Sequence, residues 1–377
     1  MKCWRKRSGW FTKYARVFAL LLCATNFVPA VSSSEETAER DFLLRGLETA
    51  VLQEANAGLL LRKNGQAFAI DNVLFLLYAV ESRNRSLFDS FLVPFSSVFL
   101  VPAEIGGESL LTVGWKYDGD APPDASGTTE TILAAKAFWN AGILWEDALL
   151  LQRSLSLVKG YLAHQSGEGR SWQIRNYYNY GTRAFATNSY ALGYFPDFLF
   201  EVACSDDFPD ASEAAGKSLR FLRNAALPNG FFSSSFDPEL RTLFPEDEFS
   251  FHFSPDFRVK PGDSAFIALN MIQSDEEIPR RTLAYLKVLW PALPDTIYGF
   301  LSVPLSENAP GISTGHLGGV YRLALRLDRN FAREVRPEVY ERGKMLLQNE
   351  HGEAWTWDAV NILLALAEER AVEMREP

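Results

Sequence analysis

The feature that most constrains the fold is a long succession of helical segments that alternate between two kinds. One kind is apolar around its whole circumference, and the next is apolar on one face only. A helix of the first kind must be buried, whereas a helix of the second kind can cover it and face water. About twelve such segments of ordinary length follow one another at similar spacing. The sequence therefore predicts an all-α fold, an (α/α)6 barrel of six helical hairpins with long loops that form a cleft at one end.

No boundary between domains interrupts these helices. Charge-rich and Ser/Gly-rich linkers are absent from the sequence, so residues 33–377 are predicted to form a single domain. The alternative is an irregular all-α arrangement or two small bundles. The expected helices lie at residues 34–56, 71–80, 87–99, 128–142, 146–162, 189–203, 211–227, 263–274, 279–290, 316–327, 337–349 and 353–370, and residues 165–183, 227–262 and 291–310 are expected to be loops.

Residues 1–32 have the features of a secretory signal peptide. Basic residues precede a short apolar run at 17–23, and Val28-Pro29-Ala30 offers small residues for cleavage. The run is well short of the roughly 20 residues that cross a membrane, so an uncleaved anchor is the weaker alternative. We therefore expect a periplasmic or secreted protein. Cleavage leaves Cys204 as the one cysteine, so stability must come from the core and not from an internal disulfide.

Charge and motif content narrow the class of ligand. The net charge of −10 argues against nucleic acid and against an anionic membrane surface. An acidic chain rich in aromatic residues suits a sugar chain better. The four histidines show no metal-ligand spacing, and Asp118, Asp120 and Asp124 lack the distal Glu of a calcium loop. No P-loop or dinucleotide fingerprint is present, so we expect neither a metal nor a cofactor.

The stretch from Trp115 to Trp145 is the part of the chain best suited to carry a site. Its first half is rich in Asp, Pro and Gly and is expected to be a loop. Its second half is expected to be a buried helix that Thr128 or Thr129 caps, with Glu130 in the first turn. Such a loop can place carboxylates at the floor of a cleft. The alternative is a solvated surface loop before an ordinary core helix.

Four short segments carry a resemblance through their order and spacing. They are Gly65-Gln66-Ala67-Phe68 with the apolar run 73–80 and Leu87-Phe88-Asp89, residues 124–126 through 141–145, Asn188-Ser189-Tyr190, and Gly262-Asp263-Ser264-Ala265. In this order they resemble the motifs of glycoside hydrolase family 8, the group that includes the periplasmic cellulase encoded with bacterial cellulose synthases. The resemblance implies an inverting β-glycanase with an (α/α)6 barrel that acts on a polysaccharide.

An inverting glycosidase needs one carboxylic acid and one carboxylate, far enough apart to hold a water against the sugar. The position that the resemblance gives to the general acid holds Asn64, which cannot donate a proton in this role. Asp71 opens the next apolar helix, where burial could raise its pKa, and it is the candidate acid. Asp263 is the candidate base. Both residues also suit a simpler role as helix caps.

The resemblance places a further pair of aspartates at the start of the buried helix, where this chain has Thr129 and Thr131. Glu130 lies between these threonines, and Asp124 lies upstream. Glu130 is therefore the third candidate for the catalytic group, and Asp124 is a candidate for positioning the sugar.

Aromatic side chains near the expected loops can stack on the apolar faces of sugar rings. The alternative is that they cover the core under long loops. The expected substrate-binding residues, together with Asp124, are Trp115, Tyr117, Trp172, Tyr178, Tyr190 and Gln66.

The predicted function is that of a secreted, endo-acting, inverting β-1,4-glucanase in the setting of exopolysaccharide or cellulose synthesis. We expect a monomer, and contact with a polysaccharide synthase or export complex is left open. Because the motif carboxylates are altered, the alternative is a non-catalytic glycan-binding accessory protein. A polysaccharide lyase that uses Tyr178, Tyr180 or His252 also stays open.

Overall fold

The structure is a computed structural model that describes residues 34–119, 121–169, 172–204, 208, 210–232, 235–236, 258–298, 310–348 and 352–375. The expected signal peptide, His252 and much of the expected loop 227–262 lie outside these residues. Within them, no helix is both long and apolar enough to cross a membrane.

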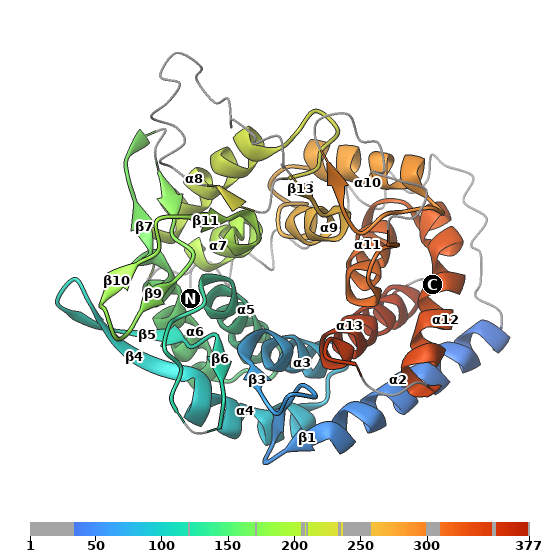
Figure 1. Cartoon of the computed structure of the whole chain (residues 1–377), viewed down its shortest axis with the longest axis horizontal. Helices are drawn as coiled ribbons and strands as arrows, with labels where there is room; N and C mark the ends of the chain where they lie inside the picture. The colour runs from blue at the N-terminus through green and yellow to red at the C-terminus, as the bar shows by residue number, and fades with distance from the viewer. Residues whose placement is uncertain are drawn as a thin grey trace.

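The helices form a closed double ring, as Figure 1 shows in a view down the ring axis. The inner ring is built by α3 (Ala69–Glu81), α5 (Thr128–Leu144), α7 (Pro196–Ala203), α9 (Pro261–Leu269), α11 (Thr314–Leu327) and α13 (Trp355–Glu373). The outer ring is built by α2 (Ser34–Glu54), α4 (Arg85–Phe99), α6 (Ala148–Leu162), α8 (Asp210–Ala225), α10 (Glu277–Leu289) and α12 (Arg329–Gln348). This alternation of outer and inner helices is the predicted (α/α)6 barrel.

The alternation in the sequence decides which helix lies inside. Eleven of the thirteen residues of α3 are buried, whereas five of the fifteen residues of α4 are. A helix that is apolar on every side can only be stable between neighbours, and the one-sided helices supply its outer cover. The ring closes where the last inner helix, α13, packs against α3, and α2 packs on both α12 and α13.

Short β-hairpins stand where the sequence predicted loops. The longest joins β4 (Leu100–Ile105) to β5 (Glu108–Val113) through Gly106 and Gly107, which both have positive φ. β7 (Gln165–Ser166) pairs with β8 (Gln173–Ile174), and β9 (Tyr178–Asn179) pairs with β10 (Ala184–Phe185), so the expected loop 165–183 is partly paired. The segment expected to begin a helix at 189 instead forms β11 (Ser189–Tyr190) and a 3-10 turn before α7 begins at Pro196.

Further two-stranded antiparallel pairs connect the segments between the helices, and only the first of them is a hairpin. They are β1 (Ala55–Asn56) with β2 (Leu59–Leu60), β3 (Ala67–Phe68) with β6 (Lys116–Tyr117), β11 with β12 (Ser235–Phe236), and β13 (Arg258–Val259) with β14 (Ile297–Tyr298). The β3–β6 pair ties the start of α3 to the loop before α5. These two inner helices supply candidate site residues.

Candidate functional site

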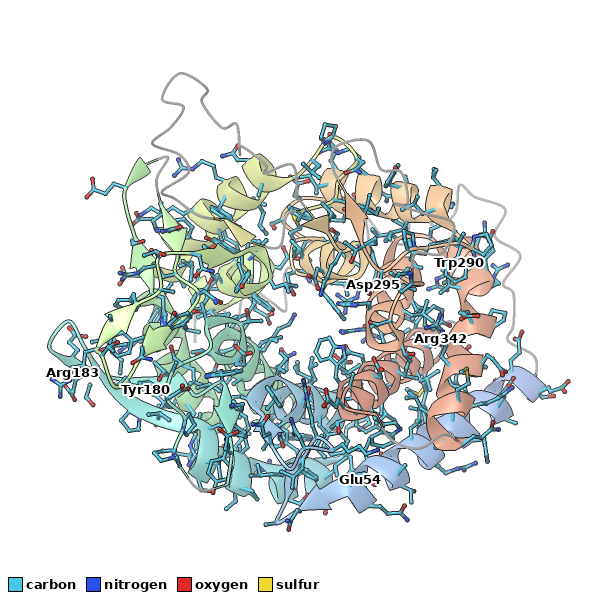
Figure 2. All side chains as sticks on the ribbon, in the orientation of Figure 1. Glu54, Tyr180, Arg183, Trp290, Asp295 and Arg342 are labelled. Atoms are coloured by element: carbon cyan, nitrogen blue, oxygen red, sulfur yellow. The ribbon has the colours of Figure 1, made fainter. Side chains whose placement is uncertain are left out.

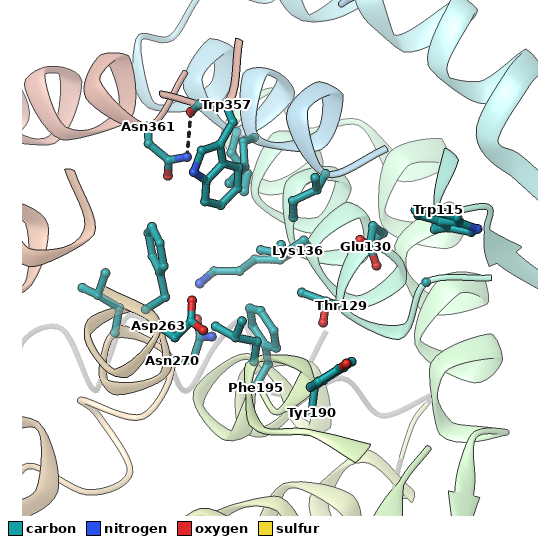
Figure 3. A pocket seen from close by; sticks show the side chains of 18 of the residues that line it. Trp115, Thr129, Glu130, Lys136, Tyr190, Phe195, Asp263, Asn270, Trp357 and Asn361 are labelled. Atoms are coloured by element: carbon teal, nitrogen blue, oxygen red, sulfur yellow. Dashed lines mark hydrogen bonds between the residues drawn. The ribbon is translucent and has the colours of Figure 1, made fainter. Parts of the chain in front are cut away.

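A cavity of about 820 Å³ opens inside the inner ring. This volume lies within the range of roughly 300–1,000 Å³ that small-molecule sites occupy in proteins. Its walls come from α3, α5, α9, α11 and α13, with the segments before α5 and α7, so residues far apart in the sequence face a common space. Figure 3 shows this cavity with the side chains that project into it.

The same position recurs at the start of the inner helices. The third residue is Asp71 in α3, Glu130 in α5, Asp263 in α9, His316 in α11 and Trp357 in α13. Because inner and outer helices alternate in direction, the inner helices begin at the same end of the barrel. Polar and aromatic side chains from distant segments therefore gather at this end.

Glu130 lines the cavity, and the residue before α5 makes room for it. A Cβ atom on Gly127 would lie 2.0 Å from Glu130 Oε2, so the carboxylate in this position folds back over a residue without a side chain. Burial raises the pKa of Glu130 to about 7, a hydrogen bond from its own backbone N–H opposes this, and the charge of Asp71 adds to it. A carboxylic acid with this pKa can donate a proton near neutral pH.

The loop before α5 is fixed by hydrogen bonds that the expected caps do not make. Thr128 and Thr129 were expected to cap the helix, but Gly127 is the N-cap, and Thr128 Oγ1 donates to the carbonyl of Arg175 at 2.7 Å instead. Thr131 Oγ1 accepts a hydrogen bond from Val113 N at 3.0 Å and donates to Gly127 O at 2.7 Å. These contacts hold the first turn of α5, and with it Glu130, against β5.

Asp263 also lines the cavity and is held by His316. His316 Nε2 lies 3.0 Å from Asp263 Oδ1, and His316 Nδ1 lies 2.7 Å from Ser313 Oγ and 3.8 Å from Asp295 Oδ1. Burial alone would lower the pKa of His316, but Asp263 and Asp295 raise it to about 9. His316 is therefore a cation at neutral pH, and its Nε2–H donates to Asp263 Oδ1 and orients this carboxylate.

Asp71 takes a different position from the one expected for a general acid. It is fully buried, does not line the cavity, and accepts hydrogen bonds from Arg62 Nε at 2.7 Å and Arg62 Nη2 at 3.0 Å. Burial raises the pKa of Asp71 and Arg62 opposes the increase. It is not the N-cap of α3 either, because Phe68 holds that position. Asp71 therefore holds Arg62, which reaches the cavity wall.

Comparison of the sequence with models of protein families finds no match, and comparison with curated proteins finds none. Comparison with solved structures finds clear similarity of fold. An α-amylase from Clostridium perfringens matches with a TM-score of 0.68 at 15% identity, over 88% of this chain and 97% of that one. An endo-1,4-D-glucanase from Vibrio fischeri matches with a TM-score of 0.65 at 13% identity, over 87% and 94%. A family 8 glycosyl hydrolase from Klebsiella pneumoniae, an endoglucanase, matches with a TM-score of 0.59 at 14% identity, over 88% and 100%.

The chain has a family 8 glycosyl hydrolase fold. The comparisons confirm the fold that the sequence resemblance implied, at identities that carry no statement about activity. Within this fold, the Gly65–Phe68 part of the first motif does not line the cavity, whereas Leu74 and Leu77 of its apolar run do. Asn64 is exposed, its Nδ2 donates to Gln66 Oε1 at 2.9 Å, and neither residue lines the cavity. We therefore do not retain Gln66 as a substrate-binding candidate.

Three of the expected binding residues line the mouth of the cavity in this family 8 fold. Trp115 and Tyr190 are exposed there, and Trp115 Nε1 donates to Asp124 Oδ1 at 2.8 Å. Tyr177, which lies in the aromatic segment between Trp172 and Tyr190, is also exposed at the cavity. Flat aromatic faces beside a carboxylate form a surface on which a sugar can bind.

The other expected aromatic residues lie elsewhere. Trp172 and Tyr178 are buried, with Trp172 Nε1 donating to Gln165 Oε1 at 3.0 Å and Tyr178 OH donating to Glu104 O at 2.9 Å. Tyr117 OH donates to Gly119 O and does not line the cavity. Tyr180 lies on the outer side of the molecule beside the β9–β10 hairpin, as Figure 2 shows. These residues pack loops onto the barrel, which was the alternative explanation of their abundance.

The inner part of the cavity holds charged and polar residues that the sequence analysis missed. Lys136 projects from the middle of α5, and Arg322 and Arg326 project from α11. One signal was available, because Lys136 interrupts an otherwise apolar run in a helix expected to be buried. Trp357 and Phe266 add an aromatic wall near Asp263, with ring centroids 5.9 Å apart. Among the described residues, no group of three metal-ligating side chains is arranged to hold a metal.

Proposed function

We propose that the chain is a glycoside hydrolase that cuts a β-linked polysaccharide, with Glu130 as general acid and Asp263 as general base. The observation that supports this most is that a carboxyl group with a pKa of about 7 shares a cavity with a second, oriented carboxylate in a family 8 fold. Aromatic side chains at the mouth suit a sugar chain. The assignment moves the acid from Asp71 to Glu130, because Asp71 is buried in an ion pair with Arg62.

In this proposal the reaction is a single displacement. Glu130 donates its proton to the glycosidic oxygen as the bond from this oxygen to the anomeric carbon breaks. Asp263 takes a proton from a water whose oxygen attacks the anomeric carbon from the opposite face. The products are a free hydroxyl on the leaving sugar and an inverted anomeric centre. His316 keeps the Asp263 carboxylate on the cavity wall throughout.

The proposed substrate rests on the sequence resemblance and not on the similar structures. The similar structures include an α-amylase, endoglucanases and xylanases by their descriptions, and their low identity transfers none of these activities. A β-1,4-glucan in an exopolysaccharide setting follows from the sequence resemblance. Secretion follows from residues 1–32 of the sequence.

Purified chain without residues 1–32 should release reducing ends from soluble β-glucans, with the new anomer inverted by NMR. Glu130→Gln and Asp263→Asn should each reduce turnover by roughly 10²–10⁴-fold, because each removes a positioned proton-transfer group. Asp89→Asn on α4 is the matched control, since this carboxylate is half exposed on the outer ring. It should leave turnover unchanged.

Two results would contradict the proposal. Release that survives both substitutions would move the chemistry to other residues. Absence of release across β-glucans and chitosan, with retained binding, would favour the non-catalytic glycan-binding protein.

A further inference from the structure

Lys136 has an unusual position for a lysine. It lies six residues after Glu130 on α5, which places it about 9 Å further along the helix axis at 1.5 Å per residue. Figure 3 shows its side chain extending into the cavity. Among the described residues it forms no ion pair. Its Nζ makes a cation–π contact with the Phe195 ring, whose centroid lies 5.8 Å away.

The charges around Lys136 leave positive charge in excess on the inner cavity wall. Arg322 and Arg326 line this wall from α11. Both form ion pairs with the buried Glu368 of α13, and Arg322 Nε lies 2.9 Å from Glu368 Oε2. Glu81, at the end of α3, is the carboxylate that lines the wall here. Among the residues that line this wall, three cations therefore face one carboxylate, while Glu368, which does not line the cavity, is shared by the two arginines.

The carboxylates on the neighbouring helix α7 do not balance Lys136 directly. Asp197 accepts hydrogen bonds from the backbone N–H groups of Gln273 and Ser274, both at 2.8 Å. Asp197 and Glu201 act on Lys136 through their charges, and neither lines the cavity.

The surroundings of Lys136 disfavour its charged form. Burial lowers the pKa of Lys136 to about 8, and the charges of Arg326 and Arg322 lower it further, while Asp197 and Glu201 oppose this. The neighbouring wall residues Leu77, Leu133 and Leu269 are apolar, so an apolar side chain at position 136 would avoid the desolvation of a cation. A ligand with a negative charge would pair with the Lys136 ammonium group and offset the cost of its burial.

We propose that the inner part of the cavity binds a carboxylate on a sugar ring of the substrate, so that the glycan contains uronic acid residues. The proposal rests on the proposed function and specifies its substrate class. A single carboxylate would pair with Lys136, because Arg322 and Arg326 are already paired with Glu368, and Lys136 Nζ would meet it as a point charge. Because Lys136 lies about 9 Å from Glu130 along α5, the acidic sugar would be next to the one being cleaved and not at the scissile bond.

The polarity of the cavity makes the proposal specific. Asp124, Glu130 and Asp263 place carboxyl groups at the mouth. The cations Arg62 and His316 there are already paired with Asp71 and Asp263. Among its described residues, the mouth therefore offers an acidic glycan no unpaired cation. Lys136, Arg322 and Arg326, in contrast, make the inner part basic. A preference for the acidic glycan must therefore come from the inner part.

The test uses two probes of equal length, cellotetraose and the β-1,4-linked tetramer of glucuronic acid. Their affinities are measured by calorimetry at pH 6.5 on chain that carries Glu130→Gln, so that neither probe is consumed. We expect the acidic tetramer to bind at least about ten-fold more tightly, corresponding to about 1.4 kcal/mol. Adding Lys136→Met should abolish or reverse this preference, whereas Lys136→Arg should retain most of it.

The matched control is Lys159→Met, which removes an exposed lysine of α6 on the outer ring and should leave the preference intact. Circular dichroism and melting temperature establish that each variant is folded. As an independent measurement, added NaCl should weaken binding of the acidic tetramer and not that of cellotetraose.

Equal affinity for the two tetramers, or a preference that survives Lys136→Met, overturns the inference and leaves the proposed function standing. Binding of neither tetramer overturns the inference too. The proposed function then depends on the separate measurement of reducing-end release by the unsubstituted chain.

Discussion

At the scale of single residues, the surroundings of Glu130 set its pKa. Gly127 leaves the space into which the carboxylate folds, and Asp71 adds negative charge from behind the cavity wall. Burial of the carboxyl group and the charge of Asp71 both raise the pKa of Glu130. The start of a helix favours the ionised form, so the raised pKa is a balance that burial wins.

The first prediction at this scale concerns the dependence of the rate on pH. A general acid acts only while protonated, so kcat/KM on a neutral β-glucan should hold below about pH 7 and fall about ten-fold per pH unit above it. With an ordinary pKa of 4.5 the fall would start more than two pH units lower. Stopped assays of reducing ends between pH 4 and 10 measure this. A fall that starts near pH 4.5, or that persists in the residual activity of Glu130→Gln, would show that another group supplies the proton.

The same residues mark the limit of prediction from sequence. Glu130, Asp263, Asp124, Trp115 and Tyr190 could be found because helix starts and aromatic loops are local features. The role of Asp71 could not, because the pairing with Arg62 depends on how the loop between β2 and β3 folds back over α3.

The inner cations could not be found either, for a related reason. Charged residues of a helix usually lie on its solvent face. Arg322 and Arg326 of the inner helix α11 line the cavity instead, and no local feature of the sequence shows this. Lys136 was the exception, since its neighbours in the sequence are apolar.

At the scale of secondary-structure elements, α9 and α11 act as a pair. Their third residues, Asp263 and His316, bond directly, and Gly262 permits the close approach because a Cβ there would lie 2.2 Å from His316 Cβ. The contact aligns the two helix starts and fixes the candidate base. Burial periodicity predicted that both helices exist, but it contains no information on this contact between neighbouring inner helices.

A second prediction follows from the raised pKa of His316. A group that binds its proton more tightly in the folded state contributes stability that is fully present below its unfolded pKa, near 6.5, and is lost as pH rises through the folded pKa of about 9. The free energy of unfolding should therefore fall between pH 6.5 and 9 by on the order of 2 kcal/mol more in the unsubstituted chain than in His316→Asn. Urea unfolding at several pH values measures the difference.

Comparing the two chains removes the contributions of Glu130 and Lys136, which titrate in the same range in both. Parallel pH dependences would mean that His316 is neutral in the folded protein, and Asp263 would then lack its cationic partner.

At the scale of the whole molecule, the ring of helices closes where α2 and α13 meet α12. The first helix of the described residues, α2, and the last, α13, both pack on α12, where Arg336 joins them. Arg336 Nε lies 2.8 Å from Glu369 Oε1 on α13, and Arg336 Nη1 lies 3.1 Å from Glu36 Oε2 on α2. Glu369 is almost fully buried, so one guanidinium neutralises a carboxylate inside the wall and ties the first helix to the last. Closure keeps α13 against α3, and thereby keeps Trp357 facing the same cavity as Glu130.

The last prediction tests this closure. Arg336→Met should lower the free energy of unfolding by roughly 3–5 kcal/mol, because it leaves the Glu369 carboxylate buried without its cation. Burial already raises the pKa of Glu369, so the loss should shrink at acidic pH, where the stranded carboxylate can take up a proton. The control is Arg280→Met on α10, where an ion pair with Glu276 has both side chains more than half exposed and should cost at most about 1 kcal/mol. Urea unfolding of the three chains at pH 7 and pH 5 gives all the comparisons. If Arg336→Met cost no more than Arg280→Met at pH 7, the ends of the chain would contribute little to holding the barrel closed, and packing between α13 and α3 would have to hold the ring closed alone.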